Sequence, residues 1–230
     1  MTTPVPSQRL AVLGAGGRTG RAITAAATAR GHQVTAVIRN PSRHTGVTRP
    51  GVTVVAGDAL DAASLTAATV GADAILSAVT PFTAPPASFD DFDLGFYRRV
   101  MDSILTSARA NGISRIICVG LFATVQSADG GLVADDERLF PPFLRPFAAA
   151  HVAGVTHLRE HGGRVDWLVL APPANLTVGA SATGGYRLGG STLDPASGVL
   201  PLSYADLAVA ILDQVDHPTR HREHLAVYGT

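Results

Sequence analysis

The sequence contains no lysine, because all eighteen of its basic residues are arginine. This absence excludes catalysis by a lysine amine, whether in a Schiff base, in a P-loop or in the tyrosine–lysine pair of many dehydrogenases. Cysteine is almost as scarce. Cys118 is the only one, which excludes an internal disulfide and a zinc site built from several cysteines. Any catalytic side chain must therefore be one other than lysine.

The sequence also lacks an excess of charge of either sign, since eighteen acidic residues balance the eighteen arginines. No net positive charge would draw the chain to nucleic acid or to an anionic membrane. No apolar run approaches the roughly 20 residues that cross a bilayer, and residues 1–9 lack the basic and apolar segments of a signal peptide. We therefore expect a soluble, cytoplasmic protein whose partner is a small molecule.

What the sequence does contain is an alternation of short apolar runs with longer segments of helical periodicity. With 230 residues, of which 46% are hydrophobic, the chain suits one folded α/β domain over residues 1–230. Strands are predicted at 10–13, 34–38, 52–56, 74–76, 115–119, 166–170 and 225–227. Helices are predicted at 18–30, 61–70, 93–110 and 149–160, and from residue 203 onward.

Long helical crossovers between consecutive strands require parallel pairing, with helices on both faces of the sheet. The sequence therefore predicts a Rossmann-like, doubly wound parallel sheet with a strand order of about 3-2-1-4-5-6. Residues 174–202 are expected to form a small substrate lobe near the C-terminus, with a hairpin around Tyr186–Leu188. The loops at 80–93 and 121–146 follow the fourth and fifth strands, at the edge where open α/β sheets bind ligands. Both are candidate substrate loops.

The strongest functional motif is a glycine-rich turn, GAGGRTG at 14–20, between the first predicted strand and helix. It departs from the G-x-G-x-x-G fingerprint, because Thr19 stands at the position of the last glycine. The spacing is instead G-x-x-G-x-x-G on Gly14, Gly17 and Gly20. Gly14 would make the tight turn, Gly17 would let backbone N–H groups approach a pyrophosphate, and Gly20 would let the helix pack closely. A dinucleotide site is favoured over a glycine-rich turn without a ligand.

The residue at the end of the second strand distinguishes the two dinucleotides. An NAD site usually carries an acid here for the ribose 2′-OH, whereas this chain has Arg39. A planar guanidinium suits the 2′-phosphate of NADP, and Arg43 or Arg18 could supply a second charge. The competing interpretation is that Arg39 is a solvated surface arginine. We therefore expect NADP(H), with NADPH preferred over NADH.

The cofactor is expected to lie along the ends of the first four strands. Asp58 follows the third strand, near the adenine, and residues 77–79 follow the fourth, beneath the ribose. The residues predicted to contact the cofactor are Gly14, Gly16, Gly17, Arg18, Thr19, Gly20, Arg39, Arg43, Asp58, Ala59, Ser77, Ala78 and Val79.

Several segments spread along the chain carry a family pattern. They are 14–20 (GAGGRTG), 37–41 (VIRNP), 55–58 (VAGD), 72–74 (ADA), His151, 158–160 (LRE), 167–173 (WLVLAPP) and 203–208 (SYADLA). Together they resemble the atypical short-chain dehydrogenase/reductases with NAD(P)-binding Rossmann domains. Within that group the sequence is most similar to the biliverdin-IXβ reductase/flavin reductase proteins and their NmrA-like relatives. The similarity weakens in the loops after the fourth and fifth strands.

The resemblance implies direct hydride transfer to a conjugated ring, which needs no tyrosine–lysine pair. Members often place a serine near the nicotinamide after the fifth strand, and Thr124 is the nearest hydroxyl in this chain. By the same resemblance, His151 is the candidate for a polar group beside the substrate, and the proton comes from a histidine or from solvent. The alternative for His151 is a solvent-facing histidine without a role.

The favoured function is NADPH-dependent reduction of a small conjugated acceptor, such as a flavin, a quinone or a tetrapyrrole-like compound. The alternative is a non-catalytic NADP(H)-binding sensor of the NmrA-like type. An epimerase or ketone reductase is disfavoured, because the tyrosine–lysine pair is absent. The sequence leaves the acceptor and the oligomeric state open.

Three further groups of residues admit two interpretations each. His217, His221 and His224 suit either a metal site or a solvated connector, and we expect no metal. Cys118, inside the fifth predicted strand, is expected to be a buried thiol rather than a nucleophile. The acids and phenylalanines at 89–96 either close over a substrate or pack before the next helix.

Overall fold

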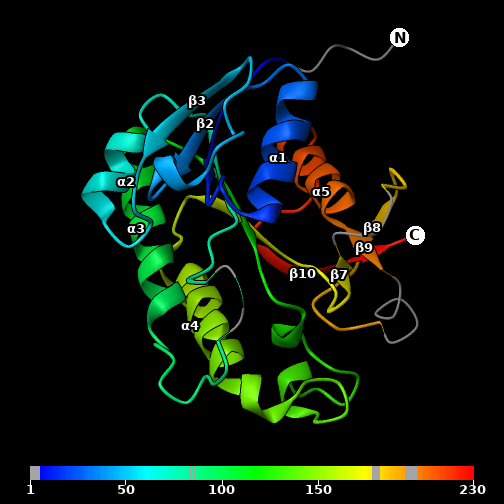
Figure 1. Ribbon diagram of the computed structural model, residues 1–230. Helices are drawn as coiled ribbons and strands as arrows, with labels where there is room; N and C mark the ends of the chain where they lie inside the picture. The colour runs from blue at the N-terminus through cyan, green and yellow to red at the C-terminus, as the bar shows by residue number, and fades with distance from the viewer. Residues whose placement is uncertain (1–5, 83, 85, 178–181, 195–200) are drawn as a thin grey trace.

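The computed structural model describes residues 6–82, 84, 86–177, 182–194 and 201–230, which form a central sheet flanked by helices (Figure 1). The main strands are β1 (Arg9–Leu13), β2 (Gln33–Ile38), β3 (Val52–Ala56), β4 (Ala74–Ser77), β5 (Arg115–Val119), β6 (Asp166–Ala171) and β10 (Glu223–Gly229). The short strands are β7 (Leu176–Thr177), β8 (Tyr186–Leu188) and β9 (Leu202–Ser203). The helices are α1 (Arg18–Ala29), α2 (Ala62–Ala68), α3 (Phe96–Asn111), α4 (Arg145–His161) and α5 (Tyr204–Asp216).

The main sheet has eight strands in the order β3-β2-β1-β4-β5-β6-β10-β8. Its first six strands confirm the predicted order 3-2-1-4-5-6, and pairing is parallel from β3 through β10. β8 pairs antiparallel with residues 227–229 of β10. The predicted hairpin around Tyr186–Leu188 is therefore wrong. These residues instead pair with the open edge of β10, which offers N–H and C=O groups to a further strand.

The predicted substrate lobe at 174–202 lies partly outside the described residues. Of its described parts, β7 pairs with β9 in a separate two-stranded parallel sheet, and β8 extends the main sheet. Both short strands are thus held by partners from the C-terminal part of the chain. The extent of a substrate lobe and the single-domain assignment stay predictions.

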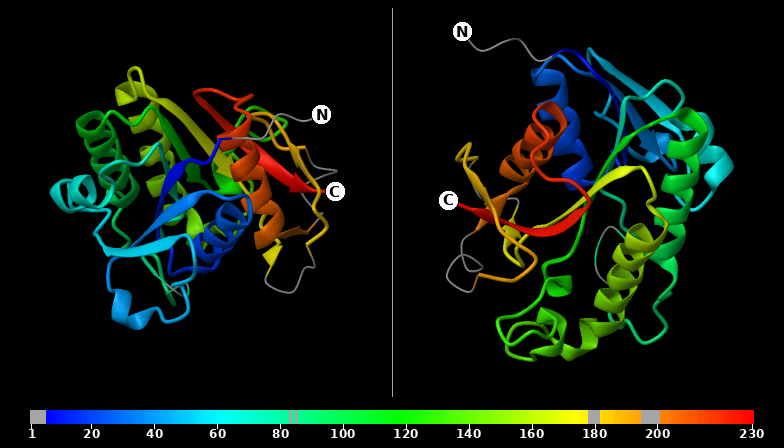
Figure 2. Two further views of the ribbon diagram at one scale, coloured as in Figure 1. Left: turned by 90° about the horizontal axis from the view of Figure 1, so that it is seen from above. Right: turned by 180° about the vertical axis from the view of Figure 1, so that it is seen from behind.

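The central strands of the sheet are buried on both faces because they carry apolar side chains on both sides. Leu10 and Val12 of β1 face α1 and α5, whereas Ala11 and Leu13 face α2, α3 and α4. All four side chains are at most 1% exposed. The view from above in Figure 2 shows the sheet between these two helical layers. In the described parts of the chain, no helix combines the length and apolar composition needed to cross a membrane.

Two helices begin three or four residues away from their predicted starts. α4 begins at Arg145 rather than at 149, because Pro146 occupies its first turn, where a missing N–H costs no hydrogen bond. α3 begins at Phe96 rather than at 93, because Asp93 accepts the N–H of Gly95 and forms a turn before the helix. The first turn of α4 therefore extends toward the loop that follows β5.

We expect Gly14→Ala to destabilise the fold much more than Gly112→Ala, although both glycines have positive φ angles, 72° and 68°. An alanine Cβ at Gly14 would lie 2.6 Å from Ala78 O, whereas at Gly112 it would meet no atom within 4 Å. The left-handed backbone costs an alanine about 1 kcal/mol, and overlap adds roughly 1–3 kcal/mol. Urea denaturation of both variants measures the difference. Equal losses of unfolding free energy would contradict the packing role of Gly14.

Candidate functional site

The carboxyl ends of β1, β2, β3 and β4 meet along one edge of the sheet. Leu13, the last residue of β1, pairs with Val37 of β2 and with Ser77 of β4. At the end of β2, Ile38 O accepts the N–H of Gly57, which follows β3. The structure thus brings together the predicted cofactor residues from four separate segments, 14–20, 39–43, 58–59 and 77–79.

The turn between β1 and α1 packs closely against the residues after β4. Ala78 donates its N–H to Leu13 O at 3.0 Å, which places its own carbonyl beside Gly14. Gly17 N–H in turn donates to Gly14 O, also at 3.0 Å. A Cβ on Gly20 would overlap that same carbonyl oxygen, so a glycine is needed for α1 to begin this close to β1. Gly14, with φ 72°, therefore makes the predicted tight turn, and Gly20 allows the predicted close packing of α1.

Gly17 differs from these two glycines, because no described neighbour crowds it. Its backbone is extended, with φ −78° and ψ 172°, and a Cβ would meet only Gly14 O, at 3.4 Å. Gly17 is also the N-cap of α1, so the first helical N–H groups receive no hydrogen bond from a cap side chain. Open space in front of such N–H groups suits the pyrophosphate of a dinucleotide. The turn therefore fits a nicotinamide cofactor.

The segment after β2 makes the adjoining part of this edge electropositive. Arg39 and Arg43 are exposed, and with the described residues neither guanidinium forms a hydrogen bond or an ion pair. Asp58, after β3, is half-buried, and its Oδ1 accepts the N–H of Leu60 at 3.0 Å. The carboxylate of Asp58 thus shapes its own turn, and Arg39 and Arg43 remain available to an anion.

Two residues that sequence reasoning missed join the glycine turn to the segment after β2. Arg21 donates from Nε to Gly16 O at 2.9 Å and from Nη2 to Thr45 O at 3.2 Å. His44 places its imidazole against Gly16, where an added Cβ would lie 2.5 Å from Nδ1. The sequence did hold one signal for the contact with His44, namely the glycine at position 16. The G-x-x-G-x-x-G spacing does not require a glycine there, so another contact had to explain it.

His151, on α4, is buried with 8% of its surface exposed, so the solvent-facing interpretation is wrong. Its ring packs against that of Tyr97 with the centroids 3.7 Å apart and the planes tilted by 30°, and the ring of Phe147 meets it edge-on at 4.7 Å. Burial, together with the nearby His224, lowers the pKa of His151 to about 3. The imidazole is therefore neutral at pH 7.

Aromatic rings from the loop after β4 pack against α4 next to His151. The ring centroid of Phe147 lies 5.3 Å from that of Phe82 and 5.5 Å from those of Phe89 and Phe92. The acids at 90, 91 and 93 remain exposed. The phenylalanines thus pack inward before α3, as one of the two interpretations predicted. We call the aromatic cluster the group of Phe82, Phe89, Phe92, Tyr97, Phe147 and His151.

Thr124, the other predicted catalytic residue, is buried beside β10. Its Oγ1 lies 2.7 Å from Leu121 O and 3.1 Å from His224 Nε2. A carbonyl can only accept, so the one hydroxyl proton goes to Leu121 and His224 must donate to Thr124 from Nε2. The hydroxyl proton of Thr124 is therefore used in a hydrogen bond to Leu121 O and is not available to a substrate. Thr124 holds the turn at 122–124, and its predicted catalytic role finds no support in this geometry.

The histidines near the C-terminus make separate contacts. His221 Nδ1 lies 2.8 Å from Asp166 Oδ2 at the surface, whereas His224 is buried and bonded to Thr124. Burial, together with the charge of Arg159, lowers the pKa of His224 to about 4. Among the residues that the structure describes, no three histidine, cysteine, aspartate or glutamate side chains are placed to hold a metal ion.

Cys118 occupies the middle of the sheet and has no exposed surface. Burial raises the pKa of its thiol to about 12, so the reactive thiolate is scarce at neutral pH. Its sulfur lies 3.7 Å from Met101 Sδ, among the side chains between the sheet and α3. The predicted buried thiol is confirmed.

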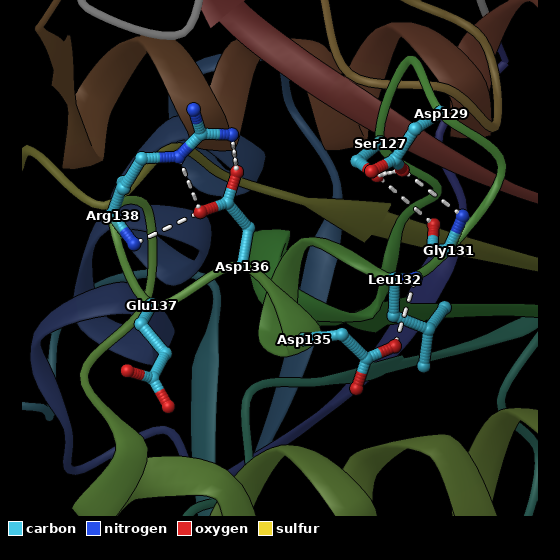
Figure 3. Close-up of a pocket in the computed structure, with 8 residues that line it drawn as sticks. All are labelled: Ser127, Asp129, Gly131, Leu132, Asp135, Asp136, Glu137 and Arg138. Atoms are coloured by element: carbon cyan, nitrogen blue, oxygen red, sulfur yellow. Dashed lines mark hydrogen bonds and ion pairs between the residues drawn. The ribbon is translucent and has the colours of Figure 1, made fainter.

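A hollow of about 290 Å³ lies in the loop after β5, lined by Ser127, Asp129, Gly131, Leu132, Asp135, Asp136, Glu137 and Arg138 (Figure 3). Three carboxylates that line the hollow accept hydrogen bonds from other residues of the same loop. Asp129 accepts from Ser127 and Gly131, Asp135 accepts from Leu132, and Asp136 accepts from Arg138. These contacts fold the loop, and the lining includes none of the predicted cofactor or catalytic residues.

We expect the free energy of unfolding to fall as the pH drops from about 6.5 toward 3. His151 and His224 have pKa values of about 3 and about 4 in the folded protein, against 6.5 for an ordinary histidine. Each is therefore neutral when folded but takes up a proton on unfolding in this range, so acid favours the unfolded chain. The stability due to their neutral state is present above pH 6.5 and is lost below it.

The histidine responsible can be identified by urea denaturation at several pH values. His151→Phe should reduce the slope of unfolding free energy against pH between pH 6 and pH 4. His217→Ala, which alters an exposed histidine, is the matched control and should leave the slope unchanged. An unaltered slope in His151→Phe would show that His151 is not a source of the acid sensitivity.

Known proteins resemble this chain over nearly its whole length. The profile of the NAD(P)H-binding family matches residues 14–218. The uncharacterized protein YwnB of Bacillus subtilis is 28% identical over 229 residues, which cover 95% of this chain and 97% of YwnB. A crystal structure from Burkholderia pseudomallei, of a protein named provisionally as exported, is 30% identical with a TM-score of 0.80 and covers 96% of this chain and 99% of its own.

A crystal structure from Streptococcus pneumoniae shares the fold, with a TM-score of 0.80, 22% identity, and coverage of 97% of this chain and 100% of its own. That protein is named provisionally as an NADH-flavin reductase. The family match begins at Gly14, the first residue of the glycine turn, and includes every residue of the predicted cofactor edge. The chain therefore belongs to the NAD(P)H-binding family of Rossmann-fold proteins, as its resemblance to the atypical short-chain dehydrogenase/reductases predicted.

Proposed function

We propose that this protein is an NADPH-dependent reductase that transfers hydride to a small conjugated acceptor, such as a flavin, a quinone or a tetrapyrrole-like compound. Membership of the NAD(P)H-binding family and similarity to structures named as reductases or dehydrogenases support NAD(P)H-dependent oxidoreduction in general. The observation that carries the finer proposal is the aromatic cluster around a neutral, buried His151.

The preference for NADPH is supported by the charges next to the glycine turn. Arg39 and Arg43 lie exposed after β2, and the carboxylate of Asp58 is engaged by the N–H of Leu60. A 2′-phosphate would gain charge-assisted hydrogen bonds from two guanidinium groups here. A ribose 2′-OH, in contrast, is usually bound by an available acid at this place in the fold.

When bound, a nicotinamide cofactor supplies the hydride. The N-terminus of α1 and the open backbone at Gly17 hold its pyrophosphate, and Arg39 holds its 2′-phosphate. The half-buried rings of the aromatic cluster, Phe82, Phe92 and Phe147, offer apolar surface on which a conjugated ring could stack, and the buried rings behind them would keep water from the reacting atoms. Because the chain has no lysine, this positioning replaces the tyrosine–lysine pair.

His151 orients the acceptor rather than supplying its proton. With a pKa of about 3, only about one His151 side chain in ten thousand is protonated at pH 7. A neutral imidazole still carries one N–H, which can donate a hydrogen bond to a carbonyl or ring nitrogen of the acceptor. The proton that follows the hydride therefore comes from solvent.

Arg39→Ala should weaken NADPH binding about tenfold or more while it changes NADH binding less than twofold. The reason is the loss of a guanidinium partner for a group that only NADPH carries. Arg98→Ala, which removes an exposed arginine on α3, is the control and should alter neither affinity. Titration of cofactor fluorescence measures both dissociation constants. Equal losses for the two cofactors would refute the assignment of Arg39 to the 2′-phosphate.

NADPH oxidation should be fast with flavin, quinone or biliverdin acceptors and negligible with simple carbonyl compounds. The ring acceptors need only positioned hydride transfer, whereas reduction of a simple carbonyl calls for a proton donor such as the tyrosine–lysine pair, which a chain without lysine cannot form. His151→Phe keeps an aromatic ring in the cluster and should lower kcat/KM for the ring acceptors about tenfold. Wild-type kcat should show no inflection from His151 between pH 5 and pH 8. Firm NADPH binding without turnover of any acceptor would instead favour the sensor.

A further inference from the structure

We propose that His44 is a further cofactor-binding residue, which donates a hydrogen bond to the 2′-phosphate of NADP(H) beside Arg39 and Arg43. This inference rests on the proposed use of NADPH. It assigns a side chain that neither the glycine spacing nor the residue at the end of β2 indicated.

The first observation is that His44 occupies the space of a missing side chain in the glycine turn. A Cβ on Gly16 would lie 2.5 Å from Nδ1, 2.6 Å from Cγ and 2.8 Å from Cε1 of the His44 ring. Gly16 is not one of the described glycines with a positive φ angle, so a residue with a side chain could adopt its backbone conformation. A larger residue at position 16 would therefore have to displace the imidazole that packs there.

The second observation is that the surrounding backbone holds His44 in place. His44 N–H donates to Pro41 O at 3.0 Å and so closes the turn at 41–43. Arg21 bonds the carbonyls of Gly16 and Thr45, which ties the residue after His44 to the glycine turn. The imidazole itself is half-buried. It is thus fixed between the two segments that hold the phosphates of a dinucleotide in this fold.

The third observation is the sign of the charges around the ring. Arg18 and Arg21 lie on α1, and Arg39 and Arg43 lie on the segment that leads to His44. None of the carboxylates in the described ranges forms an ion pair with His44 or with the two arginines after β2. Two exposed guanidinium groups next to an imidazole, none of the three in an ion pair with a described carboxylate, favour a multiply charged anion.

The position of the His44 imidazole indicates which phosphate of the cofactor it would contact, the pyrophosphate or the 2′-phosphate. The pyrophosphate is expected at Gly17 and the N-terminus of α1, and the 2′-phosphate at the end of β2. His44 belongs to the segment that leaves β2, since in sequence it comes after Arg39 and the turn at 41–43. Its ring contacts Gly16 from that segment. An imidazole N–H at this point can donate to a phosphate oxygen that Arg39 also contacts.

The experiment compares two replacements that separate packing from hydrogen bonding. His44→Phe keeps a flat ring against Gly16 but has no donor, whereas His44→Gln keeps an N–H donor without the ring. Fluorescence titration with NADPH and with NADH measures binding without an acceptor. His44→Phe should weaken NADPH about tenfold, as expected for one hydrogen bond to a charged group, and NADH less than twofold. His44→Gln should stay within about threefold of the wild type for NADPH.

Titration with 2′,5′-ADP and with ADP identifies the phosphate. The loss in His44→Phe should appear with 2′,5′-ADP, which carries the 2′-phosphate, and not with ADP. Equal losses with both would place His44 at the diphosphate and overturn the proposal, as would unchanged NADPH binding in His44→Phe. A wild-type protein that binds NADPH no better than NADH would overturn the proposed cofactor preference itself, whatever the variants do. Thermal unfolding of the free variants confirms that they fold.

The pairing of Gly16 with His44 has its own test. Gly16→Ala should displace the imidazole and weaken NADPH binding about tenfold, whereas in the His44→Ala background the same change should have less than a twofold effect. Such non-additivity is expected of residues in direct contact. Losses that simply add would show that Gly16 acts independently of His44 and would overturn the pairing.

Discussion

The close backbone contact of Gly14 with Ala78 and with Gly20 is the constraint on which the rest of the site depends. A Cβ at either glycine would overlap a backbone oxygen, so β1, β4 and α1 converge only because both side chains are missing. This convergence directs the N-terminus of α1 along the carboxyl edge of the sheet. It also leaves the backbone at Gly17 open, and an anion can reach the helix there.

Along that edge the molecule has two electrostatic environments. Around the glycine turn, exposed arginines and His44 make a cationic region, whereas aromatic rings bury His151 and its pKa falls to about 3. Charged phosphates suit the first environment, and a flat, uncharged ring suits the second. Both environments follow neighbouring parallel strands, because the glycine turn comes after β1 and the phenylalanines at 82, 89 and 92 come after β4.

The local patterns of the sequence were sufficient for most of the framework. Apolar runs identified the parallel strands in their observed order, and the glycine spacing identified Gly14 and Gly20, whose neighbours lie within one strand–turn–helix unit. The sequence reading went wrong where a partner lay far along the chain. One such case is Tyr186–Leu188, whose sequence predicts a hairpin but which pairs with the edge of β10. The early start of α4 is a separate, local effect, because Pro146 suits a first turn.

The sequence by itself thus determined the fold class, the glycine turn, the position of Arg39 and the absence of any lysine-based mechanism, because periodicity, turn chemistry and composition are local properties. Only the tertiary structure decided that His151 is buried against Tyr97, that Thr124 gives its proton to the backbone beside His224, and that His44 lies on Gly16. Thr124 and His224 are 100 residues apart. Such contacts depend on how separate elements pack, and burial rather than local sequence then sets the protonation of the histidines.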